Sequence, residues 1–263
     1  MREISGEEFK KIIFDILCVF DDFCVQNDID YVLAYGTCLG AVRHNGFIPW
    51  DDDIDVMMTR ENYNKFIELW RNNAHYKLYS HDTMGNKFVC PLPKLCDERT
   101  ILKKPNMKEK FVHGAYIDIF ILDYMPEEKE IAKKTLENAI QLSCNYMNSI
   151  SKIPNNASAK HKIYCCLLKL IGAKRFVKAL EKNIKDNVVQ KSNTLSCLNF
   201  STGGSKLWPS NFFEQTTDHI FEGRNFKIPK MYDEYLTSSY GNYMQLPPEN
   251  DRVSNHNFIP FFR

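Results

Sequence analysis

The sequence contains no long hydrophobic run. No stretch of the chain reaches the roughly 18 apolar residues that a membrane-spanning helix requires. The opening segment Met1–Glu8 carries three acidic residues, whereas a secretory signal peptide needs a positively charged start and an apolar run. We therefore expect neither a membrane span nor a signal peptide. The expected location is the cytoplasm, either free or at the inner face of the membrane.

An excess of one charge and cysteine-pairing motifs are also missing. The chain has 34 basic and 33 acidic side chains, a net charge of +1, so it lacks the positive surface that bulk nucleic-acid binding requires. Nine cysteines are an odd number, no two of them form a Cys-x-x-Cys pair, and several lie among apolar residues. We expect reduced, mostly buried thiols rather than a disulfide framework or a zinc site.

What is present indicates a globular chain in which helices and strands are mixed. Ser5-Gly6-Glu7-Glu8 has the spacing of a capping box, so a helix is expected from there to about Asn27. Short apolar runs bounded by turn residues predict strands. The expected strands are 31–34, 53–58, 76–79, 87–95, 115–122 and 226–229, the expected helices are 39–44, 61–71 and 232–243, and polar loops are expected at 103–106 and 200–209.

One region has a different character. The stretch 127–191 lacks strand signals and is typical of two or three helices, with breaks near 153–156 and at Gly172. The predicted fold class is therefore mixed α/β, with a helical insert in a catalytic core. The predicted boundaries are 1–123 for the first part of the core, 124–194 for the insert and 195–263 for the C-terminal part of the core.

Four aspartates occupy five positions of the chain: Asp51, Asp52, Asp53 and Asp55. Two carboxylates about 4 Å apart repel by roughly 4 kcal/mol at an effective dielectric constant near 20. If the segment is a strand, Asp51, Asp53 and Asp55 share one face. Three such acids make a hard-oxygen site suited to Mg²⁺ or Mn²⁺. The alternative is an acidic turn that is simply solvated.

Other polar residues lie where they could complete a phosphate-handling site. Asp118 is embedded in an apolar strand, where an acid is costly unless it is paired, metal-bound or hydrogen-bonded to backbone N–H groups. Backbone N–H groups at a helix start near Gly36 and Thr37 could face a phosphate. Three basic residues could neutralise phosphate oxygens, although each could also be an ordinary surface side chain. They are Arg43, His44 and Lys94.

Two different kinds of site could also use an acidic segment of this type. A calcium-binding EF-hand loop that starts at Asp51 would need Gly at its sixth position and Glu at its twelfth. Val56 and Asn62 occupy these positions, so the segment is not an EF-hand loop. The second kind is the Asp-x-Asp motif of metal-dependent glycosyltransferases, which bind nucleotide sugars. The local residues leave that alternative open.

The run from Gly36 to Asp55 resembles the signature of the LicD family, phosphorylcholine transferases of bacterial surface glycans that are related to fukutin and fukutin-related protein. Two departures are modest: Asn242 stands where the family commonly has an acid, and Ile121 replaces a common proline. The resemblance continues in order through 115–123, 221–223, 226–229, 235–236, 240–244 and 246–249.

The resemblance implies a nucleotidyltransferase-like fold and a metal-dependent phosphotransferase. The enzyme would move a phospho-alcohol, with phosphocholine favoured, from a CDP-alcohol to a hydroxyl of a surface glycan (teichoic acid, lipopolysaccharide or capsule) or of its lipid-linked precursor, and release CMP. Asp53, Asp55 and Asp118 fall where the family's metal-binding acids lie, with Asp51 beside them, and Mg²⁺ or Mn²⁺ is the implied cofactor. A glycosyltransferase and a non-catalytic binding protein that retains the fold are the alternatives.

Two further features bear on partners. The chain is 13% aromatic, and rings that bind the quaternary ammonium of choline by cation–π attraction would favour a choline substrate. Those candidate rings could equally belong to the core: Tyr35, Trp50, Tyr116 and Trp208. The segment 160–185 combines lysines with an apolar stripe, which predicts either a helix packed on the domain with a solvated basic face or contact with an anionic membrane.

Overall fold

The computed structural model describes residues 1–263 except 74, 86–89, 104–112, 203 and 255–257. Helix α1 (Gly6–Gln26) begins as predicted, because the Ser5 hydroxyl accepts a hydrogen bond from the Glu8 N–H at 3.3 Å. The Glu8 carboxylate pairs with Arg2 at 2.8 Å, so only one half of the capping-box arrangement is seen. The apolar face of α1 packs against the central sheet.

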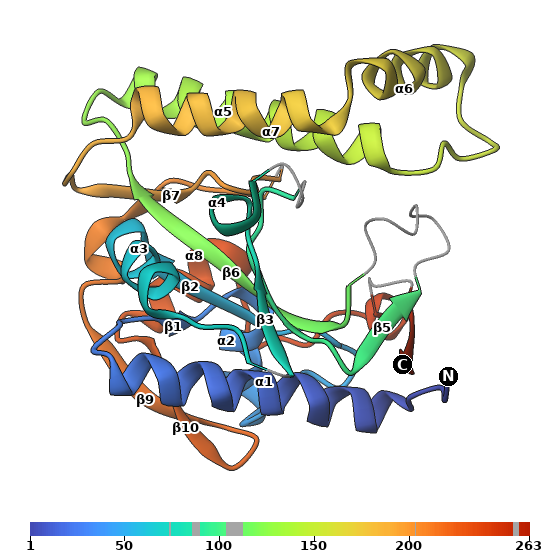
Figure 1. Cartoon of the computed structure of the whole chain (residues 1–263). Coiled ribbons are helices and arrows are strands. Elements are labelled where there is room, and N and C mark those ends of the chain that lie inside the picture. Colours follow the sequence, from blue (N-terminus) through green and yellow to red (C-terminus); the bar gives the residue numbers. More distant parts are fainter. Residues whose placement is uncertain (74, 86–89, 104–112, 203, 255–257) are drawn as a thin grey trace.

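A mixed sheet forms the centre of the molecule, which confirms the predicted α/β class (Figure 1). Strand β6 (Ala115–Tyr124) pairs in parallel with β2 (Asp55–Thr59) and antiparallel with β4 (Lys94–Asp97). It is therefore the strand that joins the two sides of the sheet. The path runs β1-β2-β6-β4-β3, β7 adds to β6, and β8 adds to β7. The bounds of these other strands are β1 Val32–Leu33, β3 Tyr76–Tyr79, β7 Thr194–Cys197 and β8 Trp208–Pro209.

The segment that carries the acids differs from the prediction. Helix α2 (Tyr35–His44) begins before the predicted start at Leu39, and β2 begins at Asp55 rather than at residue 53. Asp51 and Asp53 therefore precede the strand instead of belonging to it. The cause is that β1 is only two residues long and Tyr35, at φ 42°, already turns the chain into α2. Strand β6 continues to Ala115, but its pairing with β2 begins only at Asp118, and a turn closed by the Asp51 N–H and the Ile48 carbonyl at 2.9 Å leads into β2.

The C-terminal part adds two small two-stranded sheets. Strands β9 and β10 form a hairpin whose turn residues Glu222 and Gly223 both have positive φ, 50° and 80°, as the common two-residue hairpin turns require. Only the second of these strands was predicted. The chain ends in β11, which pairs with β5, and residue 261 also bridges to Glu3, so both termini lie at one side of the molecule (Figure 1). The bounds are β5 Thr100–Lys103, β9 Thr216–Phe221, β10 Arg224–Pro229 and β11 Ile259–Phe262.

Short helices cover the sheet and close its loops. Helix α8 ends at Tyr240 instead of Tyr243, because Gly241 at φ 68° leaves the helical conformation. The strand expected at 87–95 is seen as β4 from Lys94, residues 86–89 lie outside the described part of the chain, and so does most of the loop expected at 103–106. The bounds are α3 Arg60–Leu69, α4 His81–Met84, α8 Tyr232–Tyr240, η3 Ser210–Phe212 and η4 Glu249–Asp251.

Three helices lie between β6 and β7 and form a layer on the side of the sheet opposite α1 (Figure 1). They are α5 (Lys129–Ile150), α6 (Ala159–Ile171) and α7 (Ala173–Asn187). The predicted break at Gly172 is confirmed, and its φ of 87° explains why a glycine is found there. The layer has two apolar clusters of its own, separate from the main core.

The structure also describes the state of the cysteines and the hydrophobicity of the helices. All nine cysteines carry free thiols, and five of them are buried. Among the residues that the structure describes, no helix combines the length and the hydrophobicity needed to pass through a bilayer.

Candidate active site

Three charged residues stand side by side across neighbouring strands. Asp55 at the start of β2 is in register with Asp118 of β6, and Asp118 is in register with Lys94 at the start of β4. The Asp118 N–H also donates to the Ile54 carbonyl at 2.9 Å, which fixes the level at which the strands meet. The parallel pairing of β2 with β6 thus brings together two acids that are far apart in the sequence.

Lys94 and Asp118 form an ion pair inside the sheet. Their side chains are 10% and 13% exposed, and the Lys94 ammonium also lies 3.7 Å from the centroid of the Tyr116 ring. Burial alone would lower the pKa of Lys94, but the Asp118 carboxylate, with a smaller contribution from Tyr116, raises it above its usual value. Lys94 therefore carries its charge at neutral pH, and it neutralises Asp118 rather than facing open solvent.

Asp55 lies in a field of negative charge. Burial and then the carboxylates of Asp53, Asp118 and Asp51 raise its pKa well above the usual value, and Lys94 opposes this only in part. The backbone N–H of Asp55 donates to the Thr37 hydroxyl at 2.9 Å. The prediction for Thr37 concerned its backbone N–H and a phosphate; its buried side chain fixes the position of the first residue of β2.

The turn before β2 places Asp51 against the start of α2. A Cβ on Gly36 would lie 2.7 Å from Oδ2 of Asp51, closer than real Cβ contacts allow, so glycine at this position makes room for the carboxylate. The neighbouring Asp52 points elsewhere and accepts a hydrogen bond from the Ser254 hydroxyl at 2.8 Å. The acids of this segment therefore separate into two groups with different surroundings.

A cleft of ≈ 770 Å³ opens beside these acids. Asp51, Asp53 and Asp55 line one wall, with Gly36 and Arg43 from α2. The opposite wall comes from the end of α8 and the segment after it, and was not among the predicted site residues, although the motif segments 240–244 and 246–249 had marked this region. The residues of that wall are Tyr240, Asn242, Tyr243, Gln245, Leu246, Pro247, Pro248, Asp251 and Val253.

The predicted phosphate-binding bases are placed differently from one another. Arg43 lines the cleft and donates from Nη1 to the Tyr243 carbonyl at 2.6 Å, which ties the two walls together. His44 is half-buried next to it, and burial together with the Arg43 charge lowers its pKa, so it is neutral at pH 7. In the described part of the chain, His44, Thr37, Lys94 and Asp118 are not among the residues that line this cleft.

The candidate aromatic residues divide in the same way. Trp208 is buried against Tyr35 and Tyr235 and belongs to the core. Tyr116 is buried with the Lys94 ammonium on its face. Trp50 is different: it lines the cleft, and the Arg252 guanidinium lies 5.7 Å from the centroid of its ring. A cation therefore already occupies one face of the aromatic ring in the cleft.

The acids suit a hard cation in chemistry, but they do not form a complete cage. No group of three or more His, Cys, Asp or Glu side chains within the described ranges is arranged to hold a metal ion by itself. Asp118, predicted as a ligand, is engaged by Lys94. Mg²⁺ in phosphoryl-transfer enzymes is commonly held by one or two carboxylates together with substrate phosphates and water. The cleft acids fit that mode of binding, and they do not fit an all-protein site.

Comparison with known proteins gives one long match and several shorter ones. A family model described as LicD/FKTN/FKRP, nucleotidyltransferase domain, matches residues 28–143. The lipopolysaccharide cholinephosphotransferase LicD of Haemophilus influenzae is 28% identical over 97% of this chain and 97% of its own length. Uncharacterised proteins of Rickettsia typhi and Rickettsia prowazekii are 34% and 31% identical, over 36% and 47% of this chain and 29% and 43% of theirs. The segment 28–143 contains all the predicted acids and bases of the site.

Proposed function

Because the chain belongs to the LicD family, we propose that it transfers phosphocholine from CDP-choline to a hydroxyl group of a surface glycan or of its lipid-linked precursor. The acceptor oxygen forms a bond to the phosphorus that carries choline, the bond from that phosphorus to the CMP oxygen breaks, and the hydroxyl proton passes to a base. The near-complete coverage of a cholinephosphotransferase of lipopolysaccharide supports this activity.

The observation that carries the proposal is the charge of the cleft. Asp51, Asp53 and Asp55 line one wall, and burial followed by the carboxylates of Asp53, Asp118 and Asp51 raises the pKa of Asp55 although Lys94 opposes the shift. Such a wall repels a diphosphate unless a cation lies between them. Asp53 and Asp55 would hold Mg²⁺ together with the diphosphate of the donor, and the ion would supply charge neutralisation on the phosphate oxygens.

The other residues have roles that follow from their contacts. Arg43 lines the cleft and can reach phosphate oxygens, although it then has to share its guanidinium with the Tyr243 carbonyl. Lys94 neutralises Asp118 and so limits the charge next to Asp55. We assign the Lys94–Asp118 pair a positioning role: it fixes β4, β6 and β2 at the level where Asp55 meets the cleft.

Trp50 is our candidate for recognition of the choline head group. The quaternary ammonium of choline donates no hydrogen bond, and an aromatic face in a cleft attracts it by about 0.5–2 kcal/mol. The Arg252 guanidinium on the Trp50 ring stands in for such a cation. Ribitol or glycerol would instead leave several hydroxyl groups to be matched by polar side chains, at about 1–3 kcal/mol for each that is not.

The test compares nucleotide donors under identical conditions. Purified protein with Mg²⁺ is given CDP-choline, CDP-ribitol, CDP-glycerol or UDP-sugars, and both thermal stabilisation and the released nucleotide are measured. We expect stabilisation by CDP-choline and release of CMP once a glycan acceptor is added. Release of UDP from a UDP-sugar would support a glycosyltransferase instead. No turnover of any donor, together with no stabilisation, would support a binding protein that retains the fold.

A further inference from the structure

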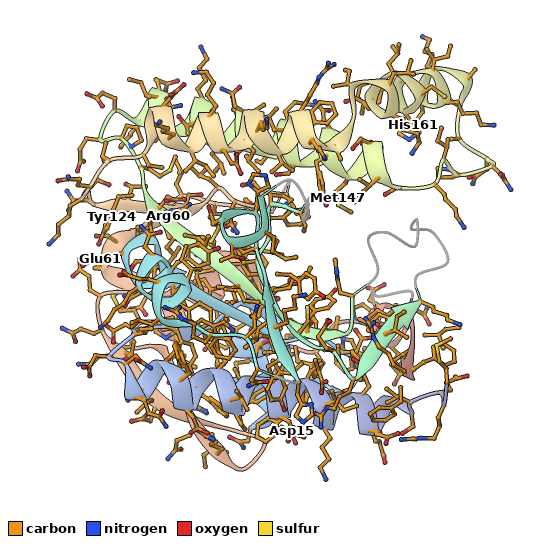
Figure 2. All side chains as sticks on the ribbon, viewed as in Figure 1. Asp15, Arg60, Glu61, Tyr124, Met147 and His161 are labelled. Carbon is orange, nitrogen blue, oxygen red and sulfur yellow. The ribbon has the colours of Figure 1, made fainter. Side chains whose placement is uncertain are left out.

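Helix α6 is apolar on two sides, and only one side is covered. Cys165 and Leu168 are buried against the rest of the helical layer, and His161, on the same side, contacts the Cys165 sulfur at 3.4 Å (Figure 2). The opposite side carries apolar residues spaced by four, three and one positions, which places them on one face. They are Ile163, Leu167, Leu170 and Ile171, exposed by 62%, 54%, 82% and 42%.

The neighbouring helix shows that this exposure is not a general property of the layer. In α7 the side chains of Phe176, Val177 and Leu180 are buried and that of Ile184 is partly buried, and the helix packs along α5. The apolar stripe predicted over both helices therefore splits into a covered part on α7 and an uncovered part on α6. A row of large apolar side chains that are this exposed to solvent indicates a surface that binds another molecule or a membrane.

The charge of the same two helices identifies that contact. Residues 159–187 contain eight basic and two acidic side chains, a net charge of +6, whereas the whole chain has a net charge of +1. Lys160 and Lys162 lie at the start of the apolar row, and Lys174 and Arg175 follow its end, all of them exposed. Nitrogen-tipped side chains project from the outer side of this layer, away from the sheet (Figure 2).

We propose that α6 docks on a membrane that contains anionic lipids. The apolar row would enter the boundary between headgroups and acyl chains, and the flanking lysine and arginine side chains would contact the lipid phosphates. A second copy of the chain is a poor occupant, because it would bring two surfaces of charge +6 together. A single convex helix with a basic border also suits a deformable surface better than a shaped protein groove.

The proposal is tested by sedimentation with vesicles, without any substrate. Wild-type protein is mixed with vesicles of phosphatidylcholine alone or of phosphatidylcholine with phosphatidylglycerol, at low and at high salt. We expect about tenfold more protein on the anionic vesicles at low salt and a loss of this excess at high salt. Absence of binding to anionic vesicles at low salt would overturn the proposal.

Three variants make the result specific to α6. L167S/L170S removes two exposed apolar groups and should reduce binding by about tenfold, and K174E/R175E should do the same by reversing two positive charges. V25S removes an apolar side chain that is 67% exposed on α1 and should bind like the wild type. Unchanged binding of L167S/L170S would refute the role of α6. The role of α6 would also be refuted if the wild type forms an oligomer in analytical ultracentrifugation and L167S/L170S dissociates it, because the apolar row would then be a subunit contact. Neither result depends on the proposed transferase activity.

Discussion

Strands β2 and β6 run parallel, and each of their ends is next to a cleft. The cleft of ≈ 770 Å³ adjoins Asp55 at the start of β2, and a second of ≈ 820 Å³ adjoins Arg60, Asp123 and Tyr124 at the other end, where Figure 2 shows Arg60 and Tyr124 close together. At the second end the buried Asp123 carboxylate receives two hydrogen bonds from Arg60, at 2.9 and 2.8 Å. The clefts are similar in size and in formal charge, since four acidic residues and one arginine line each of them, and they differ in how the acids are arranged.

The difference between the two ends of these strands shows which property of a cleft indicates a reaction site. The Arg60–Asp123 pair is complete, so that end of the sheet needs no external cation. At the other end Lys94 neutralises Asp118, yet burial and then the carboxylates of Asp53, Asp118 and Asp51 raise the pKa of Asp55. Carboxylates gathered next to a buried acid favour a bound cation, so the grouping of the acids, rather than the volume of the cleft, is our reason for placing the site here.

The largest effect is expected when one acid of the cleft is neutralised. D53N should lower the rate of CMP release by about a thousandfold, because a group that stabilises the charge of the reacting phosphates is lost. Without metal the variant should be as stable as the wild type or more stable by about 1 kcal/mol, since like-charge repulsion is relieved. Initial rates and thermal unfolding measure the two effects.

The matched control for D53N is D52N. Asp52 is the adjacent acid, but it accepts a hydrogen bond from Ser254 and is not among the described residues that line the cleft. We expect D52N to keep its activity within about threefold of the wild type, as for other changes outside the reacting groups. Full activity of D53N, or of wild-type protein in excess chelator, would contradict the metal-dependent mechanism.

At the opposite end the expected effect is on stability. R60M leaves the buried Asp123 carboxylate without its partner and should lower the free energy of unfolding by about 3 kcal/mol. R60M/D123L should recover most of that loss, because the buried charge is removed as well. Urea denaturation measures both, and activity per folded molecule should be unchanged. A loss of activity larger than the loss of folded protein would place this pair in the reaction.

A smaller effect is expected at the hydroxyl that holds the start of β2. T37V keeps the shape of the side chain but removes the acceptor for the Asp55 N–H, and should cost about 1–3 kcal/mol of stability. Because Asp55 is then less well positioned, kcat should also fall, with KM little changed. T37S keeps the hydroxyl and should restore kcat. Equal rates for T37V and T37S would mean that the hydrogen bond does not position Asp55.

The smallest effect concerns the head group. W50A should narrow the preference for CDP-choline over CDP-ribitol by about three- to tenfold, the size of one cation–π contact. W50F should retain part of the preference, because it keeps an aromatic face. The ratio of kcat/KM for the two donors measures this. A wild-type preference for CDP-ribitol would overturn the choline assignment and leave the phosphotransfer mechanism standing.

Some parts of this molecule could be predicted from local sequence patterns alone. The first helix, the central strand and the helical layer with its break at Gly172 follow from periodicity, capping and glycine. All were predicted, the helix as ending near Asn27 instead of at Gln26 and the strand as 115–122 instead of 115–124. The acids also stand out locally, since Asp51, Asp52, Asp53 and Asp55 lie within five positions of the sequence.

The remainder depends on contacts between distant segments. The start of β2 at Asp55 is determined by the length of β1 and by the Thr37 hydroxyl, neither of which is visible in the acidic segment itself. The pairing of Lys94 with Asp118 requires β4 and β6 to be neighbours, and the wall formed by residues 240–253 requires the end of the chain to return to α2. Apolar spacing likewise could not tell the covered row on α7 from the uncovered row on α6.

The wall that faces the acids has a consequence for the order in which the site appears during synthesis. Ribosomes add residues from the N-terminus at about 5–20 per second, and early segments can begin to fold before the chain is finished. The acids, α2 and most of the central sheet are made early, whereas Tyr240, Tyr243 and the residues up to Val253 leave the ribosome much later. A nascent chain therefore carries an acidic surface open on one side, and it becomes a cleft only after residues 240–253 have been made.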